Sequence, residues 1–309
     1  MPIHLLSLPT ELLNQILSPL PIPSLLKFSE TSQYARALAN CNIHSLSLGI
    51  QPLCSFATST NPHDINLRIP NAHTYSYLTL LNFQSALVSS ILTRHGSMLQ
   101  HLDLSVWALT VPIATAIANL SALRSLSLRI ESGIYGRGIP RSWKSLERDE
   151  QSKAWTLLSS AKCVWRERLT ALRVEDAELG TEQLAGILRK SGCCGELWLN
   201  RCRFVGKEVW QWLGREWEGR GALRILDVSE CGGVLGEEAV DAVGRMGELQ
   251  VCSLASNVNR EFEMMADESS ILICMTARRW TVACLNSATE MCGAYRSSYR
   301  LETLDTGRI

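Results

Sequence analysis

The chain has 309 residues, of which 46% are hydrophobic and 19% charged, a composition typical of a folded globular protein rather than a disordered one. Thirty basic residues balance thirty acidic ones, so the net charge gives no reason to expect nucleic acid or an anionic membrane as the main partner. The sequence opens Met-Pro-Ile-His without a basic segment leading into a long apolar run, and it contains no stretch of 18 apolar residues. These features predict a soluble protein of the cytoplasm, the nucleus or both, without a membrane partner.

Residues 5–39 are predicted to form three short helices. Pro9 suits the first turn of a helix, and Glu11 places a carboxylate near the positive end of the helix dipole. The apolar stripe of this first helix consists of Leu12, Leu13, Ile16, Leu17 and Leu20. The second helix is expected to carry Leu25, Leu26 and Phe28, and Thr31 is expected to cap a third that carries Tyr34, Ala35 and Leu38. So small a unit cannot bury every stripe internally, so part of this surface needs a partner.

This segment resembles the F-box, the helical motif that docks onto the Skp-type adaptor of cullin-based ubiquitin ligases. The positions that carry the resemblance are Leu8, Pro9, Glu11, Leu12, Leu13, Ile16, Leu17, Leu20, Pro21, Leu25, Leu26, Phe28, Ser29, Thr31 and Ser32. The tryptophan that many members have near the end of the motif is absent, and the third helix reads Tyr-Ala-Arg-Ala-Leu instead.

The resemblance implies that the segment binds a Skp-type adaptor and, through it, a cullin. The residues expected to contact the adaptor are Leu8, Pro9, Leu12, Leu13, Ile16, Leu17, Leu20, Pro21, Leu25, Leu26 and Phe28. The alternative is that residues 5–39 only form a helical cap on the fold that follows.

From residue 43 onward the phrase Leu-x-x-Leu-x-Leu recurs, and its alternating apolar residues predict short strands that are buried on one side. Clear copies begin at Ile43, Leu99, Leu123, Leu169, Cys194, Leu223 and Leu249, and a degraded copy lies at Ile65-x-Leu67. After Leu99 the copies start 24, 46, 25, 29 and 26 residues apart, a spacing that fits one strand and one helix per unit with a single insertion. Helical periodicity between the strands agrees with this interpretation.

This pattern resembles the leucine-rich repeat, in the variant with a cysteine three residues after the last apolar strand residue. That place is taken by Cys202, Cys231 and Asn257 in three successive units. The resemblance implies an α/β fold: a three-helix F-box followed by a solenoid with short parallel strands on its concave face and helices on its convex face. A cysteine at such a turn is expected to be a small packing residue rather than a metal ligand or a nucleophile.

Two segments depart from the repeat. Residues 131–150 combine glycine, proline and mixed charge, which predicts an insertion loop followed by a helix with Trp155, Leu158 and Trp165. Beyond residue 257 no clear repeat phrase occurs, so residues 258–309 are either an irregular C-terminal cap of the repeat stack or an aberrant tail. We therefore expect an F-box at residues 1–41, a leucine-rich-repeat domain at 42–257 and this cap or tail at 258–309.

The sequence shows no arrangement of residues typical of catalysis, metal binding or cofactor binding. The six histidines lack the spacing that would set two ligands on one helix face, and no Cys-x-x-Cys pair occurs among the eleven cysteines. Phosphate-binding loops and the Gly-x-Ser-x-Gly elbow are absent as well. We expect a non-catalytic protein without a metal or cofactor, whose cysteines are free thiols in a reducing compartment.

The period of two in each strand places the residues between the leucines on the concave face. The central outward positions are Asp103, Ser127, Arg173, Trp198, Asp227 and Ser253, and the positions two residues further on are Ser105, Arg129, Glu175, Asn200, Ser229 and Ala255. An exposed aromatic beside an arginine is typical of a binding hot spot. The candidate target-binding residues are therefore Arg173, Glu175, Trp198, Asn200 and Asp227. Whether Trp198 is exposed or is covered by the insertion or the tail stays open.

An adaptor-docking motif followed by a repeat scaffold predicts a substrate-recognition subunit of a Skp-cullin-F-box ubiquitin ligase. Such a subunit acts by proximity, because it holds a target protein at high effective concentration beside the ubiquitin-charged enzyme. The alternative is a leucine-rich-repeat scaffold that binds proteins outside ubiquitination. The identity of the target protein cannot be derived from the outward residues.

Overall fold

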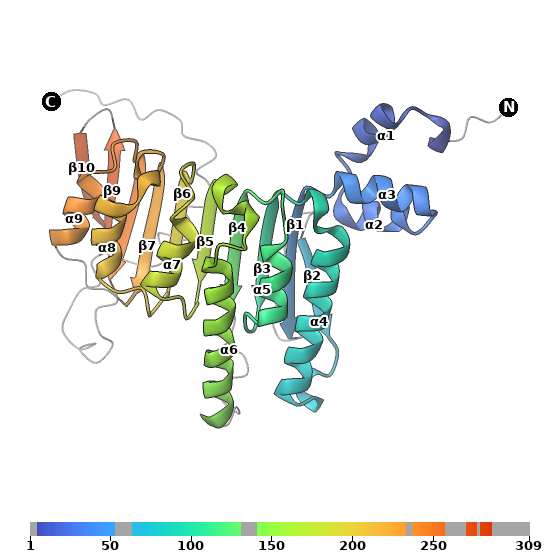
Figure 1. The fold of residues 1–309 in the computed structure, drawn as a ribbon, viewed down its shortest axis with the longest axis horizontal. Coiled ribbons are helices and arrows are strands. Elements are labelled where there is room, and N and C mark those ends of the chain that lie inside the picture. Colours follow the sequence, from blue (N-terminus) through green and yellow to red (C-terminus); the bar gives the residue numbers. More distant parts are fainter. Residues whose placement is uncertain are drawn as a thin grey trace.

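The computed structural model describes residues 5–52, 64–130, 141–232, 237–256, 270–276 and 279–285. Three N-terminal helices lie at one end of a ten-stranded sheet, and further helices cover one face of that sheet (Figure 1). The alternation of parallel strands and helices is consistent with a solenoid of the leucine-rich-repeat type, so the predicted fold class is confirmed. Within the described ranges, no helix combines the length and the apolar character needed to cross a bilayer.

The first and third N-terminal helices begin close to the residues predicted for them, Pro9 and Thr31. The three helices are α1 (Thr10–Leu17), α2 (Ile22–Ser29) and α3 (Gln33–Asn42), preceded by a 3₁₀ turn at Leu5–Ser7. Pro9 and Pro21 are the N-cap residues of α1 and α2. The cap of α3 is Ser32, whose hydroxyl accepts a hydrogen bond from the Ala35 N–H at 3.0 Å. The predicted cap, Thr31, is wrong by one residue, because its hydroxyl donates instead to the Phe28 carbonyl at 2.8 Å.

The strands run in the order β10-β9-β8-β7-β6-β5-β4-β3-β1-β2. Those that pair in parallel are β1 (Ser45–Pro52), β2 (Asp64–Ile69), β3 (His101–Val106), β4 (Ser125–Ile130), β5 (Ala171–Glu175), β6 (Glu196–Asn200), β7 (Ile225–Cys231) and β8 (Val251–Ser256). An antiparallel pair, β9 (Ser270–Thr276) and β10 (Arg279–Leu285), continues the sheet beyond β8. All seven clear repeat phrases and the degraded one coincide with strands.

The position of β2 departs from a simple succession of repeats. β1 pairs with both β2 and β3, so β2 lies at the outer edge of the sheet, and the chain must pass back over β1 to reach β3. The 19-residue helix α4 (Tyr77–His95) makes this longer return. Because β2 has a neighbour on one side only, Ile65 and Leu67 are half-buried, which explains why this copy of the phrase is degraded.

The helices after α4 lie along the same face of the sheet (Figure 1). They are α5 (Val111–Ala118), α6 (Arg141–Ser159), α7 (Thr181–Leu188), α8 (Glu208–Gln211) with a π turn at Trp212–Glu216, and α9 (Glu237–Gly244), with 3₁₀ turns η4 (Val164–Arg168) and η6 (Glu218–Gly221) before β5 and β7. The predicted loop at 131–150 is wrong for residues 141–150, which form the first half of α6; residues 131–140 lie outside the described part. The mixed charges after Pro140 are good helix formers, and no glycine or proline interrupts them.

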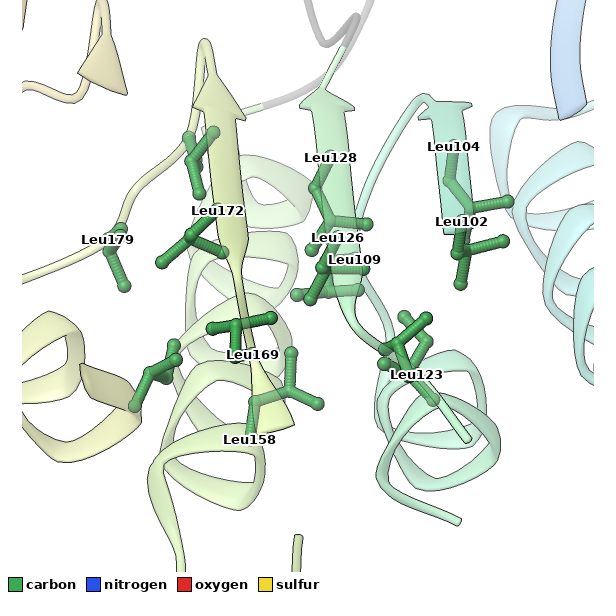
Figure 2. Close-up of a cluster of buried hydrophobic side chains, with 14 of the residues drawn as sticks. Leu102, Leu104, Leu109, Leu123, Leu126, Leu128, Leu158, Leu169, Leu172 and Leu179 are labelled. Atoms are coloured by element: carbon green, nitrogen blue, oxygen red, sulfur yellow. The ribbon is translucent and has the colours of Figure 1, made fainter. Parts of the chain in front are cut away.

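The inward side chains of the strands form the core between the sheet and the helices. Leu102, Leu126 and Leu172 stand opposite one another on β3, β4 and β5, each at most 1% exposed (Figure 2). Leu158 of α6 closes the cluster from the helical side. Each such leucine contributes about 1.5–3 kcal/mol of transfer free energy. The same core extends into the N-terminal helices through Leu13 and Leu17, so these helices are packed onto the repeat region.

Candidate interaction surfaces

The first candidate surface lies on α1. Leu12 and Ile16 are one helical turn apart and are 46% and 44% exposed, whereas Leu13 and Leu17 on the other side of the helix are at most 2% exposed. Two large aliphatic side chains therefore face solvent on a helix whose remaining apolar residues are already satisfied by the chain itself.

The other predicted adaptor contacts divide in the same way. Leu25 is 2% exposed, and Leu8, Leu20, Leu26 and Phe28 are partly buried against the core. Pro9 is exposed and Pro21 is half-buried. Leu13, Leu17 and Leu25 thus belong to the interior of the chain, because periodicity identifies an apolar stripe without saying which half of it the chain covers itself. In this conformation the surface offered to a partner is narrower than the sequence predicts.

Two further exposed apolar side chains in the N-terminal segment were missed. Leu6 is 38% and Tyr34 45% exposed. Tyr34 was assigned to the apolar stripe of α3, but the buried side of that helix consists of Ala35, Leu38, Ala39 and Asn42. The sequence did contain a signal for this orientation. Positions 35, 38 and 42 recur with the helical period and so share one face of α3, whereas position 34 lies one residue before that series.

Polar contacts join the N-terminal helices to one another and to α4. The Asn42 amide donates to Asn14 Oδ1 at 2.9 Å, joining α3 to α1. The His95 Nδ1–H at the end of α4 donates to Asn40 Oδ1 at 2.7 Å, joining α4 to α3. Burial, together with the nearby charges of Arg94 and Arg36, lowers the pKa of His95, so the imidazole is neutral at pH 7 and this bond carries no charge.

The second candidate surface is the row of outward residues on the sheet. The strand register places Ser127, Arg173, Trp198, Asp227 and Ser253 side by side on β4 to β8. The Arg173 guanidinium carbon lies 4.8 Å from the centroid of the Trp198 ring, a cation–π distance, and its Nη2 donates to Glu196 at 2.9 Å. Trp198 itself is half-buried, so it is neither fully exposed nor fully covered, the two alternatives that the sequence left open.

A cluster of ion pairs surrounds Glu175, in the row two residues further on. Its carboxylate accepts from Arg129 Nε at 2.6 Å and from Arg201 Nη2 at 2.7 Å, and Arg201 also pairs with Asp176 at 2.7 Å. Asp176 and Arg201 have φ values of 57° and 53°, at the turns that follow β5 and β6. The arginines are more exposed than the carboxylates that hold them, so guanidinium groups form the outermost part of this surface.

Asp227 stands at the other side of Trp198 in the same row. Its Oδ1 is shielded from solvent and has no hydrogen-bond partner among the described residues. Burial raises the pKa of this carboxyl to about 6, against the opposing effect of hydrogen bonds from Ser229 and Ser253. Asp227 is therefore a shielded carboxyl rather than an exposed one. Its neighbour in the row, Ser253, is also shielded, at 5% exposure. Asn200 is half-buried beside Glu175.

Within the described ranges, no group of three or more His, Cys, Asp and Glu residues is arranged to hold a metal ion. Burial raises the pKa of the thiols of Cys163, Cys194 and Cys252 to about 11, 12 and 12, so these cysteines are neutral packing residues at pH 7.

In a comparison with known protein families, residues 5–43 match the F-box domain. No curated protein matches the chain. The chain thus carries an F-box domain, followed by an α/β region of alternating helices and parallel strands. F-box proteins are generally non-catalytic adaptors, and an F-box indicates binding to a Skp-type adaptor.

Proposed function

We propose that this chain is a substrate-recognition subunit of a Skp-cullin-F-box ubiquitin ligase, with leucine-rich repeats behind its F-box. The observation that carries the proposal is the exposure of Leu12 and Ile16 on α1, inside a matched F-box whose other helices are fixed on the repeat region. Burial of two such side chains in an adaptor contributes about 3–6 kcal/mol of transfer free energy, before the costs of association are subtracted.

The domain division proposed with this function is an F-box at 1–41, repeats at 42–257 and an irregular C-terminal cap or tail at 258–309. The F-box would hold the adaptor and, through it, the cullin. The target protein would bind the repeats, on the surface formed by Arg173, Glu175, Trp198, Asn200 and Asp227. Hydrogen bonds from α3 to α1 and α4 support a mechanism by proximity, because they hold the docking helices in a fixed orientation to that surface.

The double variant Leu12→Ala with Ile16→Ala should lose binding to a Skp-type adaptor and remain folded, because both side chains face solvent and their removal leaves no cavity. A pull-down with purified adaptor, combined with circular dichroism, measures both. A matched control is Leu78→Ala with Phe83→Ala on α4, where the side chains are 42% and 49% exposed. This control should bind like the parent.

Adaptor binding by the Leu12/Ile16 variant at the parent's level would refute the docking proposal. If the parent binds the adaptor but never co-purifies with a cullin, the ligase assignment is wrong, and the chain acts as a protein-binding scaffold outside ubiquitination.

In a separate assay, the double variant Arg173→Ala with Trp198→Ala should no longer capture the target proteins that the parent captures, while it still binds the adaptor.

A further inference from the structure

The strand β2 forms one end of the sheet, and its outer edge is open. Its neighbour on the inner side is β1, and no strand among the described residues pairs with its outer side. Alternate residues of such an edge direct their backbone N–H and C=O groups away from the sheet. The pairing of β2 with β1 is unbroken from Asp64 to Ile69, and the strand contains no proline. The edge is therefore regular enough to accept another strand.

The hydrophobic core is also open at this end. Ile65, Leu67 and Ile69 point inward from β2 and are half-buried. Their partners in the register of β1 include Leu48 and Ile50, which are at most 1% exposed. The difference arises because β1 has a strand on both sides, whereas β2 has one on its inner side alone. Apolar surface therefore remains at the end of the stack for a partner to cover.

Helix α4 adds an apolar flank that faces the same end. The hydroxyls of Ser85 on α4 and Thr110, the N-cap residue of α5, are hydrogen-bonded at 2.9 Å, so this side of α4 faces α5. Phe83 and Leu87 are each two residues from Ser85, about 200° around the helix, and therefore point away from α5. Phe83 is 49% exposed and Leu87 is half-buried. Since β2 and α4 lie at the same end of the sheet (Figure 1), this flank extends the apolar surface of β2.

The order of residues on β2 fits a second copy of the same strand. When two β2 strands run antiparallel about a two-fold axis at Asn66, Asp64 of each copy stands opposite Arg68 of the other, and Ile65 stands opposite Leu67. Opposite residues share a face of the sheet, with Cβ atoms about 4.5–5.5 Å apart. The outward face thus gains two pairs of opposite charge, and the inward face gains two apolar pairs. An axis at Leu67 would place Asn66 opposite Arg68 and remove both charge pairs, so charge selects one register.

We propose that the chain forms a homodimer in which two β2 strands pair antiparallel about a two-fold axis at Asn66 and join the two sheets into one. Because this axis is perpendicular to the sheet, the helices of both copies lie on the same face, and the flanks of Phe83 and Leu87 approach each other across it. The interface uses neither Leu12 nor Ile16, so each copy keeps its exposed α1 surface.

The dimer does not depend on the function proposed above. If that function holds as well, the dimer presents two target-binding rows, on β5 to β8 of each copy, and two adaptor-binding helices. A target with two binding segments would then be held by both copies, and its second segment would bind at high effective concentration.

The test is sedimentation velocity of the full chain, with circular dichroism to monitor folding. The parent should sediment as a dimer. Asp64→Arg and Arg68→Asp each place like charges opposite one another twice, so each should raise the dimer dissociation constant about tenfold or more. A mixture of the two variants should restore the dimer, because both pairs across the axis then join opposite charges. The combined variant Asp64→Arg with Arg68→Asp should restore it for the same reason.

A matched pair of alanine variants tests the helix flank. Phe83→Ala should weaken the dimer, whereas Leu78→Ala should not, since Leu78 is similarly exposed, at 42%, but lies on the side of α4 that carries Ser85. This pair keeps the test valid if a charge-reversed variant fails to fold. A parent that stays monomeric at its highest soluble concentration would overturn the proposal. A dimer that survives every single substitution would also overturn it, as would folded charge-reversed variants that do not pair when mixed.

Discussion

Replacing Trp165 with alanine should lower the free energy of unfolding by about 3–5 kcal/mol, the range for removing a buried tryptophan. Trp165 lies in the 3₁₀ turn η4 and is 0% exposed. Its indole N–H donates to the Ile117 carbonyl at 2.9 Å, in the last turn of α5. The substitution therefore leaves a large cavity and removes one hydrogen bond to the Ile117 carbonyl, which keeps the bond from the Leu120 N–H at 3.1 Å.

Substitution by phenylalanine separates these two effects. Trp165→Phe keeps most of the ring volume and removes the indole N–H, so it should cost about 1–3 kcal/mol. Trp155 is also 0% exposed, but its indole nitrogen has no hydrogen-bond partner among the described residues. Trp155→Phe should therefore cost less than Trp165→Phe. Urea unfolding of both variants measures the difference, and equal losses would show that the bond to Ile117 contributes nothing.

The same contact recurs two strands along the sheet. The Trp217 N–H donates to the Leu188 carbonyl at 2.9 Å, at the end of α7. In both places a tryptophan that precedes a strand adds a side-chain hydrogen bond to a carbonyl at the end of the preceding helix, which also accepts from a backbone N–H. The sequence placed Trp165 in a helix with Trp155 and Leu158, and this is wrong for Trp165. Helical periodicity continued across the end of α6 and could not reveal the turn between them.

The strands and their outward rows could be predicted because both depend on local alternation. A period of two fixes which side chains face the core, and equal phrases in successive units fix the register, so Arg173, Trp198 and Asp227 do lie side by side. The position of β2 could not be predicted in this way, since alternation is the same at an edge as in the middle of a sheet.

The division of the F-box surface depends on long-range packing. Leu12 and Leu13 are adjacent leucines in one apolar stripe, and only the contact of α1 with α3 and the repeat core decides that Leu13 is buried and Leu12 exposed. The shielding of Asp227 has the same origin. Its outward position follows from the strand period, whereas the extent to which neighbours cover it does not.

This shielding gives Asp227 a large effect on stability that depends on pH. Its pKa is raised from 3.8 to about 6 by burial. Between these values the folded chain holds a proton that the unfolded chain has released, so the free energy of unfolding falls as pH rises through this window. The stabilisation is fully present below pH 3.8 and is lost above about pH 6. The loss amounts to about 3 kcal/mol.

Asp227→Asn should therefore stabilise the chain by up to about 3 kcal/mol at pH 7.5 and have little effect near pH 4. The amide stays neutral at both values, and its oxygen can still accept from Ser229 and Ser253. The measurement is urea unfolding of parent and variant across this range, compared at each pH so that other groups cancel. Asp103→Asn is the matched control, because Asp103 takes the same outward position on β3 and is exposed. It should change stability little at any pH, and an Asp227→Asn effect that is equally independent of pH would disprove the role of the buried charge.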